Sequence, residues 1–216
     1  GTYYMQNIME WLNWIVRWGH VIAGISWIGS SFYFMWLDSH LTAPETPREG
    51  VEGELWMVHS GGFYQVEKRK ISPEQMPKTL HWFKWEAAWT WISGVLLLSL
   101  IYYYNSGVYL VNSQQQVWGG GALTLLGLGF LLFSWPAYDW LWQSPLAKYG
   151  KIAGLISFLY VCLSAYGLCQ VMSGRAAYIH IGAMFGTLMV ANVWVRILPA
   201  QRQMIQATQE GRKPDF

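Results

Sequence analysis

The sequence has little charge. Only 12% of its 216 residues are Asp, Glu, Lys or Arg, against about 25% in soluble domains. The net charge of +2 and the scattered basic residues exclude a nucleic-acid-binding footprint. The two cysteines, Cys162 and Cys169, are about 10 Å apart if helical, too far for a disulfide. No CxxCH motif occurs in the sequence, which excludes a c-type haem attached to it.

Hydrophobic and aromatic residues are abundant instead. The chain is 53% hydrophobic and holds 15 Trp and 13 Tyr, side chains that gather where a membrane meets water. A helix needs about 20 mainly apolar residues to cross a bilayer. Five stretches meet that requirement: Trp18–Leu37, Trp85–Tyr104, Trp118–Trp142, Ile152–Met172 and Ala176–Leu198. The sequence therefore predicts an all-α integral membrane protein, a bundle of about five transmembrane helices in the lipid bilayer.

The positions of lysine and arginine predict the orientation of this bundle, because cytoplasmic loops carry an excess of both. Of the 14 basic residues, six lie between the first two stretches, two between the third and fourth, and four toward the carboxyl terminus. Only Arg17 and Arg175 lie on the other side. We therefore expect the N-terminus outside and the C-terminus in the cytoplasm. The transmembrane helical domain would cover residues 1–200, with a cytoplasmic loop at 38–84, and the cytoplasmic tail would cover 201–216.

The loop 38–84 is long enough to hold structure of its own. Gly61 and Gly62 separate two segments of strand-favouring residues, Glu54–Val58 and Phe63–Val66, and predict a short hairpin. At the other end of the chain, Pro199 is expected to close the last helix. The polar residues that follow predict a short helical extension with a loose end.

Two histidines lie inside predicted helices at similar depth. His20 follows Arg17 by three residues, about 4.5 Å further into the membrane, and His180 follows Arg175 by five, about 7.5 Å further in. An ionisable side chain inside a bilayer is costly and marks a functional site. Two imidazoles facing each other near the outer surface would hold the iron of a haem b. Each histidine alone would equally serve as a hydrogen-bonded packing residue.

The residues around this pair agree with a haem site. Gly24 lies one turn from His20 on the same helix face and would admit a flat macrocycle. Arg17 and Arg175 are placed to pair with haem propionates, or to anchor the helices at the interface. The predicted cofactor-binding residues are therefore His20, His180, Arg17, Arg175 and Gly24, and the two histidines are the predicted iron ligands.

The remaining histidines lie toward the predicted cytoplasmic side. His81 precedes the second stretch, close to Lys84 and Glu86. A polar cluster at a helix start is the default interpretation, and a second haem site or a substrate pocket is the alternative. His59 adjoins the glycine turn and His40 follows the first helix, and both are interpreted as loop histidines.

Several long motifs resemble a known family. They are RWGHVIAGISWIG at Arg17–Gly29, GELWMVHSGGFY at Gly53–Tyr64, LHWFKWEAAWTWISG at Leu80–Gly94, IHIGAMFGTLMVAN at Ile179–Asn192 and PAQR at Pro199–Arg202. These motifs resemble the bacterial membrane-bound urate oxidase (urate hydroxylase) family along nearly the whole chain. The resemblance implies a multi-pass protein of the bacterial inner (cytoplasmic) membrane with a role in purine catabolism.

The resemblance also implies an oxidoreductase that oxidises urate toward 5-hydroxyisourate and passes the electrons through haem b to a periplasmic cytochrome c. We assign proton transfer and anion binding to Glu54, His59, Lys84 and Glu86, on the predicted cytoplasmic side. Longer family members have about eight spanning helices followed by a cytochrome c domain. The present sequence is then either part of a longer protein or a short homologue that passes electrons to further membrane subunits.

Other functions stay open beside this one. The main alternative is a non-catalytic haem b subunit, for electron transfer or structure, in a larger respiratory membrane complex. A membrane haem protein that oxidises a porphyrin precursor is a weaker alternative. A transporter is weaker still, since no inverted repeat or broken-helix pair occurs in the sequence.

Overall fold

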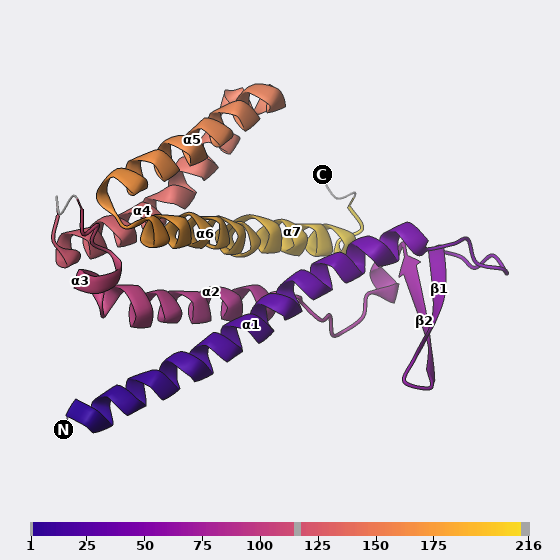
Figure 1. Ribbon diagram of the computed structural model, residues 1–216. Helices are drawn as coiled ribbons and strands as arrows, with labels where there is room; N and C mark the ends of the chain where they lie inside the picture. Colours follow the sequence, from indigo (N-terminus) through magenta and orange to yellow (C-terminus); the bar gives the residue numbers. More distant parts are fainter. Residues whose placement is uncertain (1, 115–117, 213–216) are drawn as a thin grey trace. The chain divides into compact units, whose positions relative to one another are not determined.

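The structure is a computed structural model that describes residues 2–114 and 118–212. The last residues of the predicted tail, 213–216, lie outside this part. In chain order (Figure 1) the elements are α1 (Thr2–His40), β1 (Val51–His59), β2 (Gly62–Arg69), η1 (Pro73–Gln75), α2 (Trp85–Leu98), η2 (Ser99–Tyr103), α3 (Ser106–Tyr109), α4 (Gly120–Gln143), η3 (Pro145–Lys148), α5 (Gly150–Val171), α6 (Gly174–Ala191), η4 (Asn192–Ile197) and α7 (Leu198–Gln209). The described part is therefore mainly helical, as predicted.

The chain forms two compact units. The first contains Gly1–Gly24 and Trp85–Val193, and the second contains Ile25–Lys84 and Trp194–Phe216. The long helix α1 contributes its first part to one unit and its last part to the other. The continuous helix from α6 to α7 is divided in the same way.

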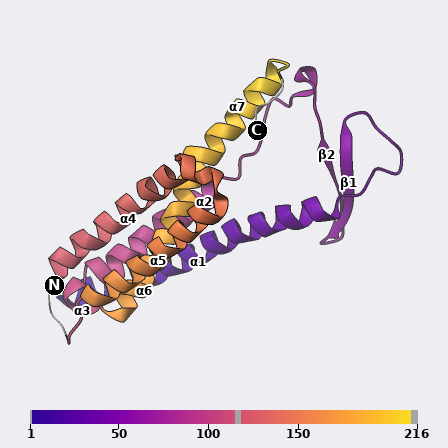
Figure 2. The same ribbon diagram turned by 90° about the horizontal axis from the view of Figure 1, so that it is seen from above.

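Helix α6 is central in the first unit. It packs against α2, α4 and α5 (Figures 1 and 2). The apolar core between these helices contains Leu98, Tyr102, Leu110, Leu123, Leu131, Leu168, Met172, Ala176, Ala177 and Met184. Ser173 begins α6 as an N-cap, because its hydroxyl accepts a hydrogen bond from the backbone N–H of Ala176 at 3.2 Å. The short link between α5 and α6 is therefore well defined, and it makes the two helices antiparallel neighbours.

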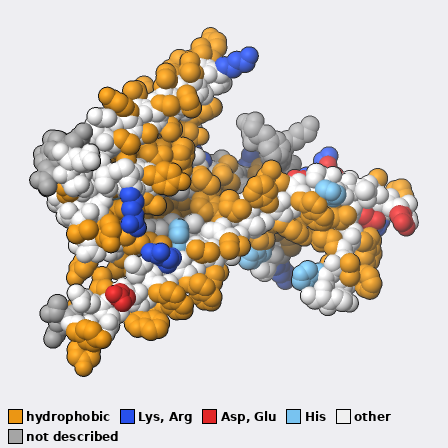
Figure 3. Space-filling model, in the orientation of Figure 1, with side chains coloured by type: hydrophobic (Ala, Val, Ile, Leu, Met, Phe, Trp, Pro, Cys, Tyr) orange, Lys and Arg blue, Asp and Glu red, His pale blue; other side chains and the backbone are white. Residues whose placement is uncertain are grey.

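Four helices in the described residues are long and apolar enough to cross a membrane: Trp85–Tyr103, Gly120–Gln143, Gly150–Val171 and Gly174–Gln209. They correspond to the last four predicted stretches. Only 11–22% of each span is buried inside the protein, so most of its apolar side chains face outward, as they do against lipid (Figure 3). Helix α1 contains Trp18–Leu37 and is long enough to cross, but it is less apolar, so a fifth span stays a prediction.

The last span does not end at Pro199, which corrects the expectation from the sequence. The helix continues through the π-helical segment η4 and on through α7 to Gln209. Proline has no N–H to donate and its ring clashes with the carbonyl one turn earlier in a regular helix. The wider π-helical turn just before Pro199 accommodates this defect. The predicted polar extension is confirmed as helix α7.

The predicted hairpin in the loop 38–84 is confirmed and is longer than expected. Strands β1 and β2 are antiparallel, with Val58 opposite Phe63 and His59 opposite Gly62. The two-residue turn uses the left-handed backbone region at Ser60 (φ 49°) and Gly61 (φ 78°), which suits the twist of a tight hairpin. Glycine at the second of these positions is therefore a backbone requirement.

Candidate functional site

His180 of α6 is fully buried, and both of its ring nitrogens are hydrogen-bonded. Nδ1 lies 2.8 Å from the backbone oxygen of Ala176. A carbonyl oxygen only accepts, so Nδ1 carries the proton. Nε2 therefore keeps a lone pair, which accepts a hydrogen bond from the Tyr103 hydroxyl at 3.0 Å. This tautomer is the one in which a histidine binds a metal through Nε2.

Gly127 of α4 makes room for this imidazole. A Cβ at this position would stand 2.5 Å from Nε2 of His180 and 3.0 Å from the Tyr103 hydroxyl. Any side chain there would displace the ring or the helix. Sequence reasoning missed Gly127 and Tyr103, because α4 contains several glycines and no pattern marks which one faces α6.

The π-helix η2 directs two consecutive tyrosines toward α6. Tyr103 contacts His180, and the Tyr102 hydroxyl accepts a hydrogen bond from Nε of Arg175 at 2.9 Å. The Arg175 guanidinium also lies 5.6 Å from the Tyr102 ring centroid and 5.1 Å from that of Tyr109. A π-turn adds a residue to the helical turn and so re-aims the side chains at its end. Aromatic side chains thus hold Arg175, and its pairing with a propionate stays a prediction.

His20 of α1 is half-buried and contacts α2. Its Nδ1 lies 2.9 Å from Oγ of Ser93. That hydroxyl donates its proton to the backbone oxygen of Trp89 at 2.7 Å, so it accepts from Nδ1–H of His20. In the neutral imidazole, this hydrogen bond leaves the lone pair of His20 on Nε2, as in His180. Gly94 allows the close approach, since a Cβ there would stand 3.1 Å from Cε1 of His20.

The other predicted cofactor residues of α1 lie on either side of His20. A Cβ at Gly24 would meet no atom of the described chain within 4 Å, so the helix surface is open there. Arg17 is exposed, and its Nη2 donates to Oδ1 of Asn13 at 3.2 Å. Both residues stay predicted haem contacts.

The second span positions both histidines. His20 contacts it at Ser93 and Gly94, whereas His180 is bonded to Tyr103, ten residues further along, which is about 15 Å of helix. Imidazoles that offer Nε2 are the donor type of a bis-histidine haem, so the residue types suit that group. Two ligands of one iron must lie at the same level, however, and the contact points of these two histidines on the second span are about 15 Å apart. The described residues hold no cluster of three or more His, Cys, Asp or Glu side chains suited to a bare metal ion.

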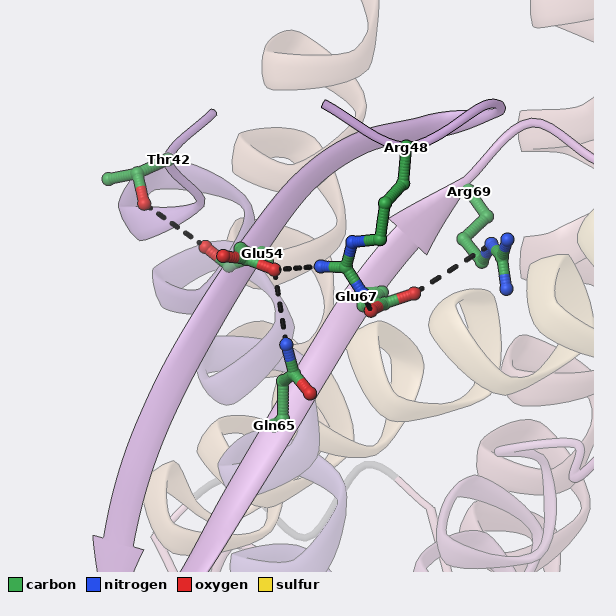
Figure 4. A network of polar contacts seen from close by, with 6 residues as sticks. All are labelled: Thr42, Arg48, Glu54, Gln65, Glu67 and Arg69. Carbon is green, nitrogen blue, oxygen red and sulfur yellow. Dashed lines mark hydrogen bonds and ion pairs between the residues drawn. The ribbon is translucent and has the colours of Figure 1, made fainter. Parts of the chain in front are cut away.

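Glu54 is engaged in a polar network of the hairpin (Figure 4). It is only 8% exposed, and its carboxylate accepts hydrogen bonds from the Arg48 guanidinium and, at 3.1 Å, from Nε2 of Gln65. Arg48 also pairs with Glu67. The network ties the loop before β1 to both strands. The carboxylate of Glu54 thus already has its charge partner.

His59 ends strand β1 as an exposed residue whose Nδ1 lies 3.1 Å from Oγ of Ser60. It follows Glu54 by five residues, and side chains alternate between the two faces of a strand. Glu54 and His59 therefore point to opposite faces of the hairpin and do not form one site.

His81 and Lys84 occupy the segment before α2. His81 is exposed and meets the Phe83 ring edge-on, with 4.7 Å between centroids. Nζ of Lys84 lies 5.6 Å from the centroid of the Trp194 ring. Both side chains thus contact aromatic rings. The predicted polar cluster with Glu86 and the alternative of a second haem site at His81 stay predictions.

Glu86 carries an unsatisfied acceptor in the first turn of α2. Its Oε2 is buried, and in the described part of the chain no donor is hydrogen-bonded to it. A buried oxygen without a donor costs roughly 1–3 kcal/mol. Of the four predicted catalytic residues, Glu86 is therefore the one prepared to accept a hydrogen bond or a proton from a ligand.

Comparison with known proteins gives one match. The family model described as Urate oxidase N-terminal matches residues 6–216. No curated protein matches the chain, and no solved structure matches it. The expected relation to urate oxidases is thereby confirmed.

Proposed function

Because the chain belongs to the urate oxidase N-terminal family, we propose that it is a membrane haem b oxidoreductase that oxidises urate and passes the electrons to a periplasmic cytochrome c. The match over residues 6–216 is the observation that carries the proposal, and the substrate follows from it. The four apolar helices support a membrane location. The bacterial inner membrane separates the cytoplasm, which supplies the purine, from the periplasm, which holds the cytochrome c.

His20 and His180 would each offer Nε2 to the iron of haem b. Because their contact points on the second span are about 15 Å apart, binding of both to one iron would require α1 and α6 to shift along that span. The support is their shared tautomer, in which Ser93 and the Ala176 carbonyl accept from the Nδ1–H groups. Such partners of the second nitrogen fix the ring and strengthen the ligand. When bound, the haem would carry single electrons from the substrate to the one-electron acceptor. Arg175 would contribute guanidinium N–H groups to a propionate.

The chemistry requires a proton acceptor from the protein. Urate and one water give 5-hydroxyisourate with release of two electrons and two protons. A ring N–H of the purine donates to Glu86 Oε2, which has no other donor among the described residues. Loss of that proton to the carboxylate raises the electron density of the ring and favours its oxidation. Lys84 would neutralise the urate anion.

Urate-dependent reduction of a soluble cytochrome c by the purified protein in vesicles tests the function. The expected result is reduction that requires both urate and the protein. The haem is tested separately, by the spectrum of the dithionite-reduced protein. We expect His20→Ala and His180→Ala to lose the haem b absorption and His40→Ala to keep it, since His40 is exposed at the end of α1. If the haem b spectrum is normal but urate does not cause reduction of cytochrome c, urate is rejected as the substrate and haem b is retained as the cofactor.

The second candidate is a haem b subunit without catalysis, in a complex whose other subunits oxidise the substrate. The geometry of the hairpin favours it, because Glu54 is neutralised by Arg48 and points away from His59. A tightly bound partner that oxidises urate in the absence of this chain would establish this candidate instead.

A further inference from the structure

The hairpin is charged at its base and free of charge at its tip. The base holds the ion pairs Lys70–Glu52 (2.8 Å) and Lys68–Asp38 (2.9 Å). The hydrogen bond and charge of Lys70 lower the pKa of Glu52, and those of Asp38 raise the pKa of Lys68, so Glu52 and Lys68 stay charged at neutral pH. From residue 55 to residue 64, by contrast, the chain has no Asp, Glu, Lys or Arg.

The tip is also strongly apolar and exposed. Trp56, Val58 and Phe63 are 61%, 69% and 79% exposed. Val58 lies opposite Phe63 across the hairpin, and Trp56 lies opposite Gln65, so the three apolar side chains share one face. In the space-filling view (Figure 3), hydrophobic side chains lie along the hairpin. An exposed apolar patch of this kind marks a surface that contacts something other than water.

The contacts between the hairpin and α1 show which way the tip points. At the base, Lys68 pairs with Asp38, and nearer the tip the Tyr33 hydroxyl donates to the sulfur of Met57 at 3.7 Å. The hairpin therefore leaves the end of α1 with its tip turned toward the level of Tyr33, and it does not pack along the helix. Tyr33 lies about 7.5 Å before Asp38 along the helix, inside the apolar stretch that ends at Leu37. Met57, one residue before Val58, therefore contacts a residue of that apolar stretch.

From this placement we propose that the hairpin tip inserts Trp56, Val58 and Phe63 into the headgroup region of the bilayer that α1 crosses. The proposal rests on the membrane location in the proposed function and on the predicted crossing of the bilayer by α1. Aromatic side chains favour the membrane–water interface, and a tip without charge can enter it while the ion pairs at the base remain in water.

Site-specific fluorescence tests the insertion. Cys162 and Cys169 are replaced by serine, and an environment-sensitive fluorophore is attached to Val58→Cys or Phe63→Cys. Glu45→Cys, exposed in the loop before β1, is the matched control in the same unit. The proteins are placed in vesicles of phosphatidylethanolamine and phosphatidylglycerol, with or without brominated lipid. We expect brominated lipid to quench positions 58 and 63 and aqueous iodide to quench them several-fold less than position 45.

Two results would overturn the insertion. Iodide quenching at positions 58 and 63 equal to that at 45 would place the tip in water. Protection from both quenchers would mean that a protein, such as a second copy, covers it. Urate-dependent cytochrome c reduction is measured on the same vesicles. If the tip is not inserted but the reduction is observed, the insertion is rejected and the proposed function stands.

Discussion

Replacing Gly127 with alanine tests how tightly α4 is packed against the buried histidine. The new methyl group would stand 2.5 Å from Nε2 of His180 and 3.0 Å from the Tyr103 hydroxyl. Carbon contacts are most favourable at about 3.5–4.0 Å, so the ring or the helix must move by about 1 Å. His180 is fully buried and cannot move outward into free space.

The expected loss of stability follows from two contributions. Overpacking of a well-packed core costs about 1–3 kcal/mol. Displacement of the ring weakens its bond with Tyr103, which contributes about 0.5–1.5 kcal/mol. For a chain of this size, 1 kcal/mol lowers the melting temperature by about 2–4 °C. We therefore expect Gly127→Ala to melt roughly 3–18 °C below its control.

Gly129→Ala is the matched control. It lies on the same helix, and a Cβ there would meet no atom of the described chain within 4 Å. Both variants gain the same helix propensity from alanine, so their difference isolates the contact with His180. Thermal unfolding of the haem-free protein in detergent, followed by circular dichroism, measures it. Equal melting temperatures for the two variants would refute the packing described for Gly127.

Three further substitutions test the site. Tyr103→Phe removes the hydroxyl that competes with haem iron for Nε2 of His180. Haem titration of the apoprotein should therefore show about two- to tenfold tighter binding. Weaker binding would contradict a competition between the hydroxyl and the iron. Ser93→Ala removes the acceptor for His20 Nδ1–H and should weaken haem binding about 10–100-fold; unchanged affinity would exclude a role for that hydrogen bond. Glu86→Gln should lower urate-dependent cytochrome c reduction by about 10²–10⁴-fold with an unchanged haem spectrum; full activity would exclude Glu86 as the base.

Much of the fold was predictable because local composition dictates it. Runs of about 20 apolar residues are recognisable without knowledge of the neighbours, and four such helices are present. The hairpin was predictable for the same reason, since Gly61 supplies a backbone conformation that few other residues adopt. The end of the last span was not predictable, because the π-helical turn that accommodates Pro199 has no signal in the sequence.

The site was predictable only in part. A histidine inside an apolar stretch is conspicuous, so His20 and His180 were found from the sequence. Their partners were not found, because Ser93 and Tyr103 lie 73 and 77 residues from them. The role of Gly127 depends on which face of α4 meets α6, and the apolar residues of α4 surround the helix without favouring one face. Glu86 was found, but its unsatisfied oxygen is a property of the packed structure.

The closed state of His180 has a consequence for how the cofactor would enter. Both ring nitrogens are hydrogen-bonded within the chain, so His180 leaves no orphaned polar group at this position. Iron binding would exchange the hydrogen bond from Tyr103 for an iron–nitrogen bond, and the Tyr103 hydroxyl would then need another acceptor. Because the backbone at Gly127 closes the same side of the ring, α4 and α6 must separate before the macrocycle reaches Nε2. Haem insertion is therefore expected to be slow into the folded bundle and fast during folding.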